Sequence, residues 1–427
     1  MSFSNGLKKA VKKYNDTNLI LRIVIGLAVG VVLGLTLKSW TWIAVFGDLF
    51  VGALKAMAPV LVFVIVANAL AQSRSRLDRR FGTLIFLYML TTFDAAVLAV
   101  LTSFAFPQNI TLAAAQESAA APQGLGEVFT TMLNNIASNP FAAIIDGNYI
   151  GILFWAILFG FAMKRLAADS SRVFMANVAD AVSQIVRWII NLAPFGICGI
   201  VYNNVSTNGM SIFTDYGKLI LLLVGTMLLQ ALVIAPFIAF LYLRRNPYPL
   251  LFRCLRESGV TAFFTRSSAA NIPVNMALCE KLGIDKEMYS VAIPLGATIN
   301  MDGAAITITI MTLAAANTLG IRVSLPAAIL LSFISAIGAC GASGIAGGSL
   351  LLIPLACSLF GISNDIAMQV VAVGFIIGVV QDSVETALNS SGDVLFAATA
   401  DYRHKIKTGQ PLPEFMMTKK EKEARKS

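Results

Sequence analysis

The sequence predicts an all-α polytopic membrane protein, and three observations indicate this fold class. Hydrophobic residues make up 57% of the 427 residues. Charged residues make up only 13%, whereas soluble domains carry about 25%. The apolar residues gather in long runs, and most charges lie between the runs. Water cannot solvate such a chain on all sides, so we expect most of it to lie in a bilayer.

The composition excludes several classes of function. The single histidine is His404, and the five cysteines stand far apart without a CxxC pair. Histidine-based metal sites, zinc sites and a disulfide scaffold are therefore excluded. The net charge of +9 does not indicate a nucleic-acid partner, because the basic residues lie between apolar runs and not on one face of a soluble module.

Long apolar runs predict the membrane spans. A helix needs about 20 mostly apolar residues to cross the bilayer. Eight runs meet this length, at residues 19–37, 43–71, 81–106, 141–163, 173–203, 217–243, 288–319 and 366–400. An even number of spans places both termini on the same side.

Basic residues indicate which side is cytoplasmic. They gather in the two terminal segments and in alternate connections, at residues 8–13, 74–80, 164–172, 244–256, 281–286 and 403–426. The other connections hold few basic residues, and the loop 107–140 holds none. Both termini are therefore expected in the cytoplasm. The first run lacks a small-residue cleavage site, so we expect it to be retained as a span.

Two further apolar stretches, 257–276 and 324–360, do not fit this alternation as single spans. Each must enter and leave on its own side, which predicts two opposed re-entrant hairpins with tips at Thr265–Ser268 and Gly341–Gly348. Irregular backbone at membrane depth is tolerated only against protein or a water-filled cavity, so such tips usually line a site. Two ordinary spans with a small-residue turn are the alternative for the second stretch.

Three carboxylates share one face of the last predicted span. At about 100° per residue, Asp382, Glu385 and Asp393 lie on a stripe with Thr386 and Asn389. Ionisable groups inside a span are costly and indicate function. They need protons, metal ions or a ligand ammonium as partners. A helix end facing the cytoplasm would account for Asp393 but not for Asp382.

The seventh predicted span contains Asn300 and Asp302, which would point about 200° apart on a continuous helix. An unwound segment removes this conflict and supplies backbone carbonyls to a cation. The oxygen-only donors suit a hard cation, and we expect sodium. A structural hydrogen bond between helices is the alternative. Tyr88, Thr91 and Thr92 share one face of the third span, although hydroxyls there are also common as packing groups.

The order of these features resembles the dicarboxylate/amino acid:cation symporter family, which has the glutamate-transporter fold. The resemblance depends on TRSS in the first tip, GATINMDG in the seventh span, the small-residue second tip and NSSGD in the last span. It covers essentially the whole chain. Within the family, the chain is similar to the bacterial sodium-coupled serine/threonine transporters. This similarity implies L-serine and L-threonine as substrates, Na⁺ as the co-transported ion, and a homotrimer in the bacterial inner membrane.

The resemblance also implies roles for individual residues at matching positions. The implied sodium ligands are Gly296, Thr298, Asn300, Asp302, Asn389, Asp393, Tyr88, Thr91 and Thr92. The implied substrate pocket consists of Ser268, Asp382, Glu385, Thr386, Asn389, Gly344, Ile345 and Gly347. In that pocket Asp382 takes the substrate ammonium and Ser268 the α-carboxylate, while residues 344–348 form the outer gate.

The sequence departs from the pattern of the family members that transport acidic substrates. Those members have an arginine one residue before the position of Thr386, where this chain has Glu385. A carboxylate there repels aspartate and glutamate, so we expect small neutral hydroxy amino acids. Ala304 and Ala346 replace a common threonine and proline. Charge balance also suggests that Arg266 neutralises either Glu385 or Asp382.

These observations divide the chain into three predicted regions. Residues 1–256 form a scaffold-rich half with spans one to six, and residues 257–400 form a transport core with both hairpins and the last two spans. Residues 401–427 form a basic cytoplasmic tail. Opposed hairpins around central polar groups predict alternating access.

Three other functions compete with this interpretation. Gly341–Gly344 matches the GxSG pattern of a serine protease, but the serine needs an adjacent base and His404 lies beyond the last span. A passive channel would need a continuous polar pore. A sodium- or proton-coupled dicarboxylate symporter is the closest alternative, and Glu385 argues against it.

Overall fold

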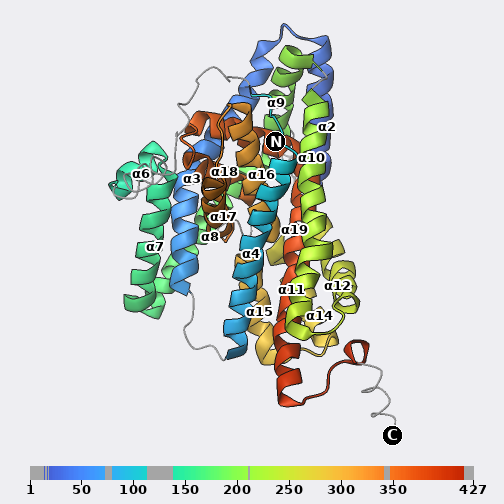
Figure 1. Cartoon of the computed structure of the whole chain (residues 1–427). Coiled ribbons are helices and arrows are strands. Elements are labelled where there is room, and N and C mark those ends of the chain that lie inside the picture. The colour runs from blue at the N-terminus through green and yellow to red at the C-terminus, as the bar shows by residue number, and fades with distance from the viewer. Residues whose placement is uncertain are drawn as a thin grey trace, which may run out of the picture.

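The computed structural model describes residues 14, 17, 19–72, 79–112, 138–209, 212–340 and 347–417. Every regular element in these ranges is helical, which confirms the all-α prediction, and most long helices run along one direction (Figure 1). The first half contains α2 (Leu19–Thr36), η1 (Thr41–Ile43), α3 (Ala44–Gln72), α4 (Arg79–Ala105), α6 (Pro140–Asp146), α7 (Tyr149–Leu166), α8 (Asp169–Asn191), α9 (Ala193–Asn208), α10 (Ile212–Leu229), η3 (Gln230–Ile234) and α11 (Ala235–Leu243). The second half contains α12 (Tyr248–Cys254), η4 (Leu255–Gly259), α13 (Val260–Thr265), α14 (Ser268–Lys281), α15 (Lys286–Ile299), α16 (Asp302–Thr318), α17 (Leu325–Ala339), η5 (Gly348–Leu352), α18 (Ile353–Ser358), α19 (Asn364–Thr408) and η6 (Glu414–Met416).

Seven helical stretches in the described residues are long and apolar enough to cross a bilayer. They are Thr41–Gln72, Arg80–Ala105, Tyr149–Leu166, Asp169–Asn191, Thr214–Leu243, Lys286–Thr318 and Asn364–Thr408. The apolar stretch Leu21–Thr36 is shorter than these. The polytopic class is therefore confirmed, and the count of eight spans stays a prediction.

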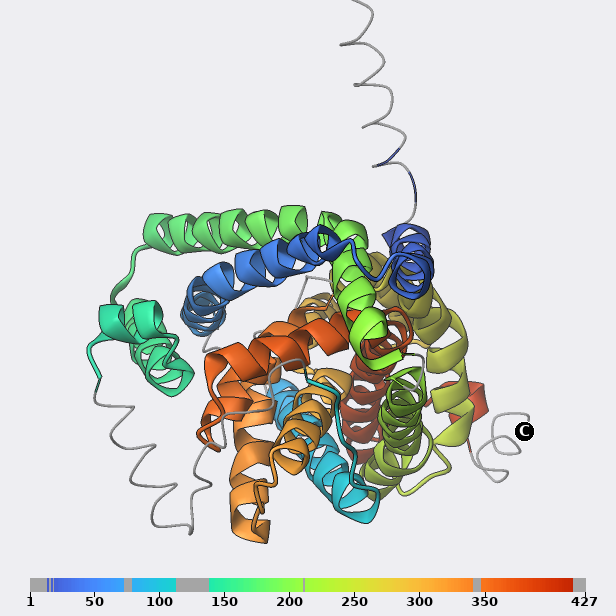
Figure 2. The ribbon, with the colours of Figure 1, turned by 90° about the horizontal axis from the view of Figure 1, so that it is seen from above.

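The helices form two packed groups. Helices α2, α3, α7, α8 and α9 pack on one another, whereas α4 packs against α16, α17 and α19. Seen from above, the blue α3 and the green α8 lie along one side of the molecule, and the cyan α4 lies toward the other side (Figure 2). The predicted boundary at residue 256 stays a prediction.

Small residues bring α2 and α9 close together. Gly26, Gly30 and Gly34 lie four residues apart on α2, and all three face α9. A Cβ atom at Gly30 would lie 2.6 Å from the carbonyl oxygen of Cys198. This spacing is the small-residue packing that allows helices to approach closely in a membrane.

The fifth predicted span is not one continuous helix. We expected a single run over 173–203, but α8 ends at Asn191 and α9 begins at Ala193. Pro194 stands in the first turn of α9. Proline has no N–H to donate and its ring clashes with the preceding turn, so it fits the start of a new helix better than the interior of a long one.

The two arms of each predicted hairpin are helical and pack on each other. The first turns at Arg266, which has a left-handed backbone (φ 51°), and the Ser267 hydroxyl caps α14 by accepting from the N–H of Ala270 at 3.2 Å. This turn lies within the predicted tip, the first arm already begins at Tyr248, and the re-entry into the membrane stays a prediction. The second hairpin consists of α17, η5 and α18, and residues 341–346 of its tip lie outside the described residues.

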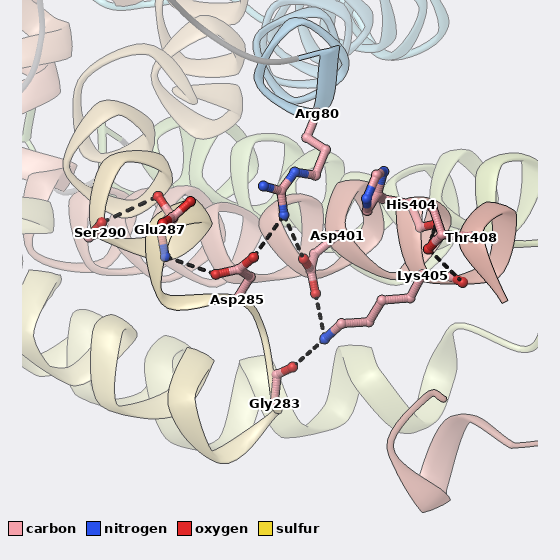
Figure 3. A network of polar contacts seen from close by, with 9 residues as sticks. All are labelled: Arg80, Gly283, Asp285, Glu287, Ser290, Asp401, His404, Lys405 and Thr408. Carbon is pink, nitrogen blue, oxygen red and sulfur yellow. Dashed lines mark hydrogen bonds and ion pairs between the residues drawn. The ribbon is translucent and has the colours of Figure 1, made fainter. Parts of the chain in front are cut away.

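An ion-pair network joins three elements at the end of the bundle where α4 begins (Figure 3). Arg80 donates from Nη1 to Asp285 Oδ2 at 2.9 Å and lies 3.9 Å from Asp401 Oδ1. Lys405 Nζ lies 2.8 Å from Asp401 Oδ2. The network therefore fastens the start of α4 to the start of α15 and to the last turns of α19.

The network predicts a stability difference that depends on pH. The hydrogen bond from Arg80 lowers the pKa of Asp285 below its ordinary value. A carboxyl whose pKa is lower in the folded state stabilises the fold above its unfolded pKa, about 3.9, and loses this contribution as the pH falls through the folded value. Asp285→Asn should therefore lower the thermal unfolding midpoint in detergent at pH 7, with the gap to wild type closing below about pH 4.

The effect should be small, under about 1 kcal/mol, because the Asp285 side chain is 39% exposed and solvent screens the pair. Unfolding curves of wild type and variant, recorded between pH 7 and pH 3, test whether the difference in unfolding midpoint shrinks as the pH falls. A gap that stays constant or widens in acid would contradict this account.

Candidate functional site

The chain unwinds between α15 and α16, as the sequence predicts. Asn300 (φ −93°, ψ 81°) and Met301 (φ −121°, ψ 47°) are both non-helical. Asn300 Nδ2 donates to the carbonyl oxygen of Asn389 at 3.1 Å and to Asp393 Oδ1 at 3.0 Å. The break therefore turns the Asn300 side chain toward α19. The hydrogen bonds of Asn300 connect the predicted cation-binding residues of the seventh span with those of the last span.

Hydroxyls of α4 bind the other side of the break. Thr92 Oγ1 donates to Asp302 Oδ1 at 3.2 Å and accepts from the N–H of Met301 at 3.1 Å. Thr91 Oγ1 lies 3.4 Å from Asn300 Oδ1. The hydroxyl face predicted for the third span thus contacts Asn300 and Asp302. These contacts join residues that are more than 200 positions apart in the sequence.

Gly296 lies where a side chain would collide with its neighbours. A Cβ atom there would lie 2.7 Å from Asp393 Oδ1 and 2.9 Å from Tyr88 Oη. Tyr88 Oη donates to the carbonyl oxygen of Asp393 at 2.9 Å, so these three residues form one compact unit. The Thr298 hydroxyl instead donates to the carbonyl oxygen of Leu295 on its own helix at 2.7 Å. The predicted role of the Thr298 carbonyl stays a prediction.

Gln230 also belongs to this cluster, and the sequence did not identify it. It begins the π-helix η3, and its Nε2 donates to Asp302 Oδ2 at 3.0 Å. Its Oε1 is buried and has no partner among the described residues. The sequence offered one signal for Gln230, a single amide in the apolar run 217–243. A single amide in such a run often serves only helix packing, so this signal did not indicate a site. Single-turn π-helices are frequent at functional sites.

The cluster has the electrostatics of a cation site. Asp302 and Asp393 are buried, and no basic side chain in the described ranges pairs with either carboxylate. Asp393 Oδ2, like Gln230 Oε1, is buried and has no hydrogen-bond partner in the described part of the chain. Uncompensated buried carboxylates are costly. Carboxylate, amide, hydroxyl and carbonyl oxygens together suit a hard cation such as Na⁺.

The second part of the site lies between the first hairpin and α19. Nε and Nη2 of Arg266 both lie 2.7 Å from Asp382 Oδ2, and both side chains are nearly buried. Of the two carboxylates that Arg266 was expected to neutralise, the distances therefore select Asp382. Ser268 is the first residue of α14. A helix N-terminus presents free N–H groups and positive potential to an anion.

Asn389 connects the cation cluster to this pocket. Its Oδ1 accepts from the N–H of Gly303 at 2.7 Å, and its carbonyl binds Asn300. Thr386 Oγ1 donates to the carbonyl oxygen of Asp382 at 2.7 Å, within its own helix. Both predicted pocket residues therefore lie on the α19 face that bears Asp382, next to the start of α16.

One described residue of the second hairpin reaches the pocket. The backbone of Gly347 lies beside Asp382 and is left-handed (φ 70°), a conformation that favours glycine. The other predicted gate residues, Gly344 and Ile345, lie outside the described residues, as does Ser343 of the GxSG pattern.

Among the described residues, Glu385 bonds to neither Arg266 nor the carboxylates of the cation cluster. Its Oε2 accepts from Thr307 Oγ1 at 2.7 Å, from Ser349 Oγ at 2.9 Å and from Gln381 Nε2. None of these three donors was among the predicted site residues. The pocket thus contains one carboxylate paired with arginine and a second carboxylate held only by neutral donors.

A broken helix with buried carboxylates that no described basic side chain pairs, next to a polar pocket on the last helix, is typical of an ion-coupled secondary transporter. The chain belongs to the sodium:dicarboxylate symporter family, whose model matches residues 19–402. The predicted family is therefore confirmed, and a transporter, not an enzyme, is the class it indicates.

Relatives resemble the chain over nearly its whole length. It is 68% identical over 419 residues to the serine/threonine transporter SstT of Bifidobacterium adolescentis, covering 98% of this chain and 97% of that protein. It is 57% identical over 396 residues to proteins of the same name from Streptococcus thermophilus and Streptococcus agalactiae, covering 92% of this chain and 98% of each relative.

Proposed function

We propose that this protein imports L-serine and L-threonine together with Na⁺ by alternating access. The observation that carries the proposal is the charge balance of the pocket. Arg266 is paired with Asp382, and Glu385 adds a second negative charge without any cation beside it in the described residues. Such a pocket favours the ammonium of an amino acid. The names of the similar transporters support the same substrates.

A dicarboxylate substrate fits this pocket poorly, although the name of the family includes such substrates. A side-chain carboxylate needs a free cationic group, and the one pocket arginine in the described residues already binds Asp382. Glu385 would repel the second carboxylate. We therefore infer that this chain uses the family scaffold for neutral amino acids.

Sodium coupling without obligatory protons is the expected energy source. The mixed oxygen donors around Asn300, Asp302 and Asp393 support Na⁺ as the cargo ion, and no histidine lies near them in the sequence. In proteoliposomes, an inward sodium gradient should drive labelled serine above its external concentration. A pH gradient in sodium-free buffer should not. Accumulation driven by the pH gradient alone would overturn the assignment.

The proposal also includes the membrane, the topology and the oligomeric state of the transporter. Large apolar side chains such as Leu49, Phe174 and Leu221 are exposed, as expected for surfaces that face lipid or neighbouring protomers. Together with the basic connections, they support a homotrimer in a bacterial inner membrane with both termini in the cytoplasm. Residues 257–400 would then act as the moving core.

A further inference from the structure

One oxygen of Glu385 is held by three side chains from three elements. Oε2 accepts from Thr307 on α16, from Ser349 on η5 of the second hairpin, and from Gln381 one turn earlier on α19. A carboxylate offers about four acceptor positions over its two oxygens. Three donors therefore more than occupy the two positions of Oε2. Because Ser349 belongs to the second hairpin, the orientation of Glu385 also depends on how that hairpin packs.

The other oxygen, Oε1, makes no hydrogen bond with any described residue. Glu385 keeps 5% of its surface exposed, whereas Thr307 and Gln381 keep none and Ser349 keeps 1%. Most of the remaining accessible surface of this cluster thus belongs to Glu385 and not to its donors. A nearly buried acceptor without a donor is unfavourable. A ligand that brings a donor to Oε1 would remove this cost.

The donors are themselves fixed. Gln381 Nε2 donates to Thr307 Oγ1 at 2.7 Å as well as to Glu385, and Thr307 Oγ1 lies 3.0 Å from the carbonyl oxygen of Gly303. A Cβ atom at Gly303 would lie 2.9 Å from Glu385 Cα and 3.0 Å from its Cγ. The start of α16 therefore packs closely against the backbone and Cγ of Glu385, and the three donors orient the carboxylate beyond Cγ.

We propose that Thr307, Ser349 and Gln381 are positioning residues that orient the Glu385 carboxylate so that Oε1 accepts the hydroxyl of the substrate. This inference rests on the proposed function, because it requires a hydroxy amino acid in the pocket. Glu385 lies three residues after Asp382, on the same face of α19. The β-hydroxyl of a serine or threonine whose ammonium binds Asp382 can therefore point along this face toward Glu385.

The arrangement also explains how the pocket would discriminate serine from alanine. With serine bound, Oε1 gains a donor. With alanine bound, a methyl group takes the place of the hydroxyl and Oε1 stays unpaired. This cost is the reason why sites that bind a substrate hydroxyl reject analogues without that hydroxyl. If the three donors are removed, the carboxylate can turn away, and the preference for the hydroxyl falls.

The test uses two pairs of matched variants in the full-length protein. Thr307→Val removes one donor, and Thr309→Val is its control, because Thr309 is equally buried on α16 and its hydroxyl has no described partner. Ser349→Ala removes another donor, with Ser335→Ala as a control on α17 chosen by the same criteria. Inhibition of labelled L-serine uptake by unlabelled L-serine and L-alanine, in proteoliposomes with saturating sodium, gives the hydroxyl preference as a ratio of inhibition constants.

We expect wild type to prefer serine, and Thr307→Val and Ser349→Ala to reduce this ratio about tenfold by weakening serine alone. The controls should keep the wild-type ratio, and all four variants should keep the wild-type sodium dependence. Equal weakening of serine and alanine, or an unchanged ratio, would overturn the positioning role. Wild-type uptake without a preference for serine over alanine would overturn this inference but leave the proposed function. Absence of serine uptake by wild type would overturn the proposed function itself.

Discussion

Replacing Asp302 or Asp393 by asparagine is expected to raise the sodium concentration for half-maximal serine uptake about a hundredfold. The substitution removes charge and leaves the hydrogen bonds largely intact. An asparagine at 302 can still accept from Thr92, and Gln230 can turn its amide so that its unpaired Oε1 meets the new NH₂ group. What is lost is the attraction of a buried carboxylate for a cation, worth on the order of 3 kcal/mol.

Asp382→Asn should give the opposite pattern, with serine affinity reduced about a hundredfold and sodium dependence little changed. Asp382 lies in the pocket with Arg266, apart from the bonds that surround Asp302 and Asp393. Asp169→Asn, a fully exposed acid-to-amide change on α8, is the matched control. Uptake measured over a grid of sodium and serine concentrations separates the two effects. Equal losses of sodium and serine affinity in all three variants would show that the two binding sites are not distinct.

Glu385→Arg is expected to abolish measurable serine transport, a loss of more than about a hundredfold. The change reverses a nearly buried charge and places a second guanidinium in the pocket that already holds Arg266. The surroundings can nevertheless accept the new side chain. The hydroxyls of Thr307 and Ser349 can act as acceptors, and Gln381 Oε1 is buried with no partner among the residues that the structure describes.

The same variant should gain some aspartate uptake, because arginine can bind a side-chain carboxylate through two parallel hydrogen bonds. This gain is expected to be smaller than the loss, since Ala304 and Arg266 are unchanged. Glu385→Gln is the control: it keeps the acceptor without the charge, and should transport serine with reduced affinity. Labelled serine and labelled aspartate are measured in parallel. Wild-type uptake that aspartate blocks as strongly as threonine would refute the role of Glu385 as a filter against acidic substrates.

Much of the fold follows from the sequence because a bilayer imposes apolar runs of fixed length. The break at Asn300–Asp302 was predictable because two polar side chains on opposite faces of one helix cannot both avoid lipid. The break at Leu192 was not predicted, since the run stays apolar on both sides of it. The π-helices η3 and η4 have no distinct pattern, because one extra residue per turn leaves the hydropathy unchanged.

The charged members of the site were predictable, and their neutral neighbours were not. A carboxylate inside an apolar run is rare enough to indicate function, which identified Asp382 and Asp393. Thr307, Ser349 and Gln230 are common residue types in packed helices. Their importance arises only when distant elements bring their side chains to Glu385 or Asp302. Likewise, charge balance left two partners for Arg266, and only the distances select Asp382.

We expect sodium at the broken helix and an amino acid beside Asp382 to bind cooperatively in one protein. Coupling between two ligands is reciprocal, so it can be measured from either side. Calorimetric titration of L-serine into the detergent-solubilised protein, at several sodium concentrations with choline as the replacement ion, tests it most directly. The account predicts that the serine Kd falls at least tenfold as sodium rises to saturation, and that Asp302→Asn shifts this fall to higher sodium. A serine Kd that is the same with and without sodium would contradict it.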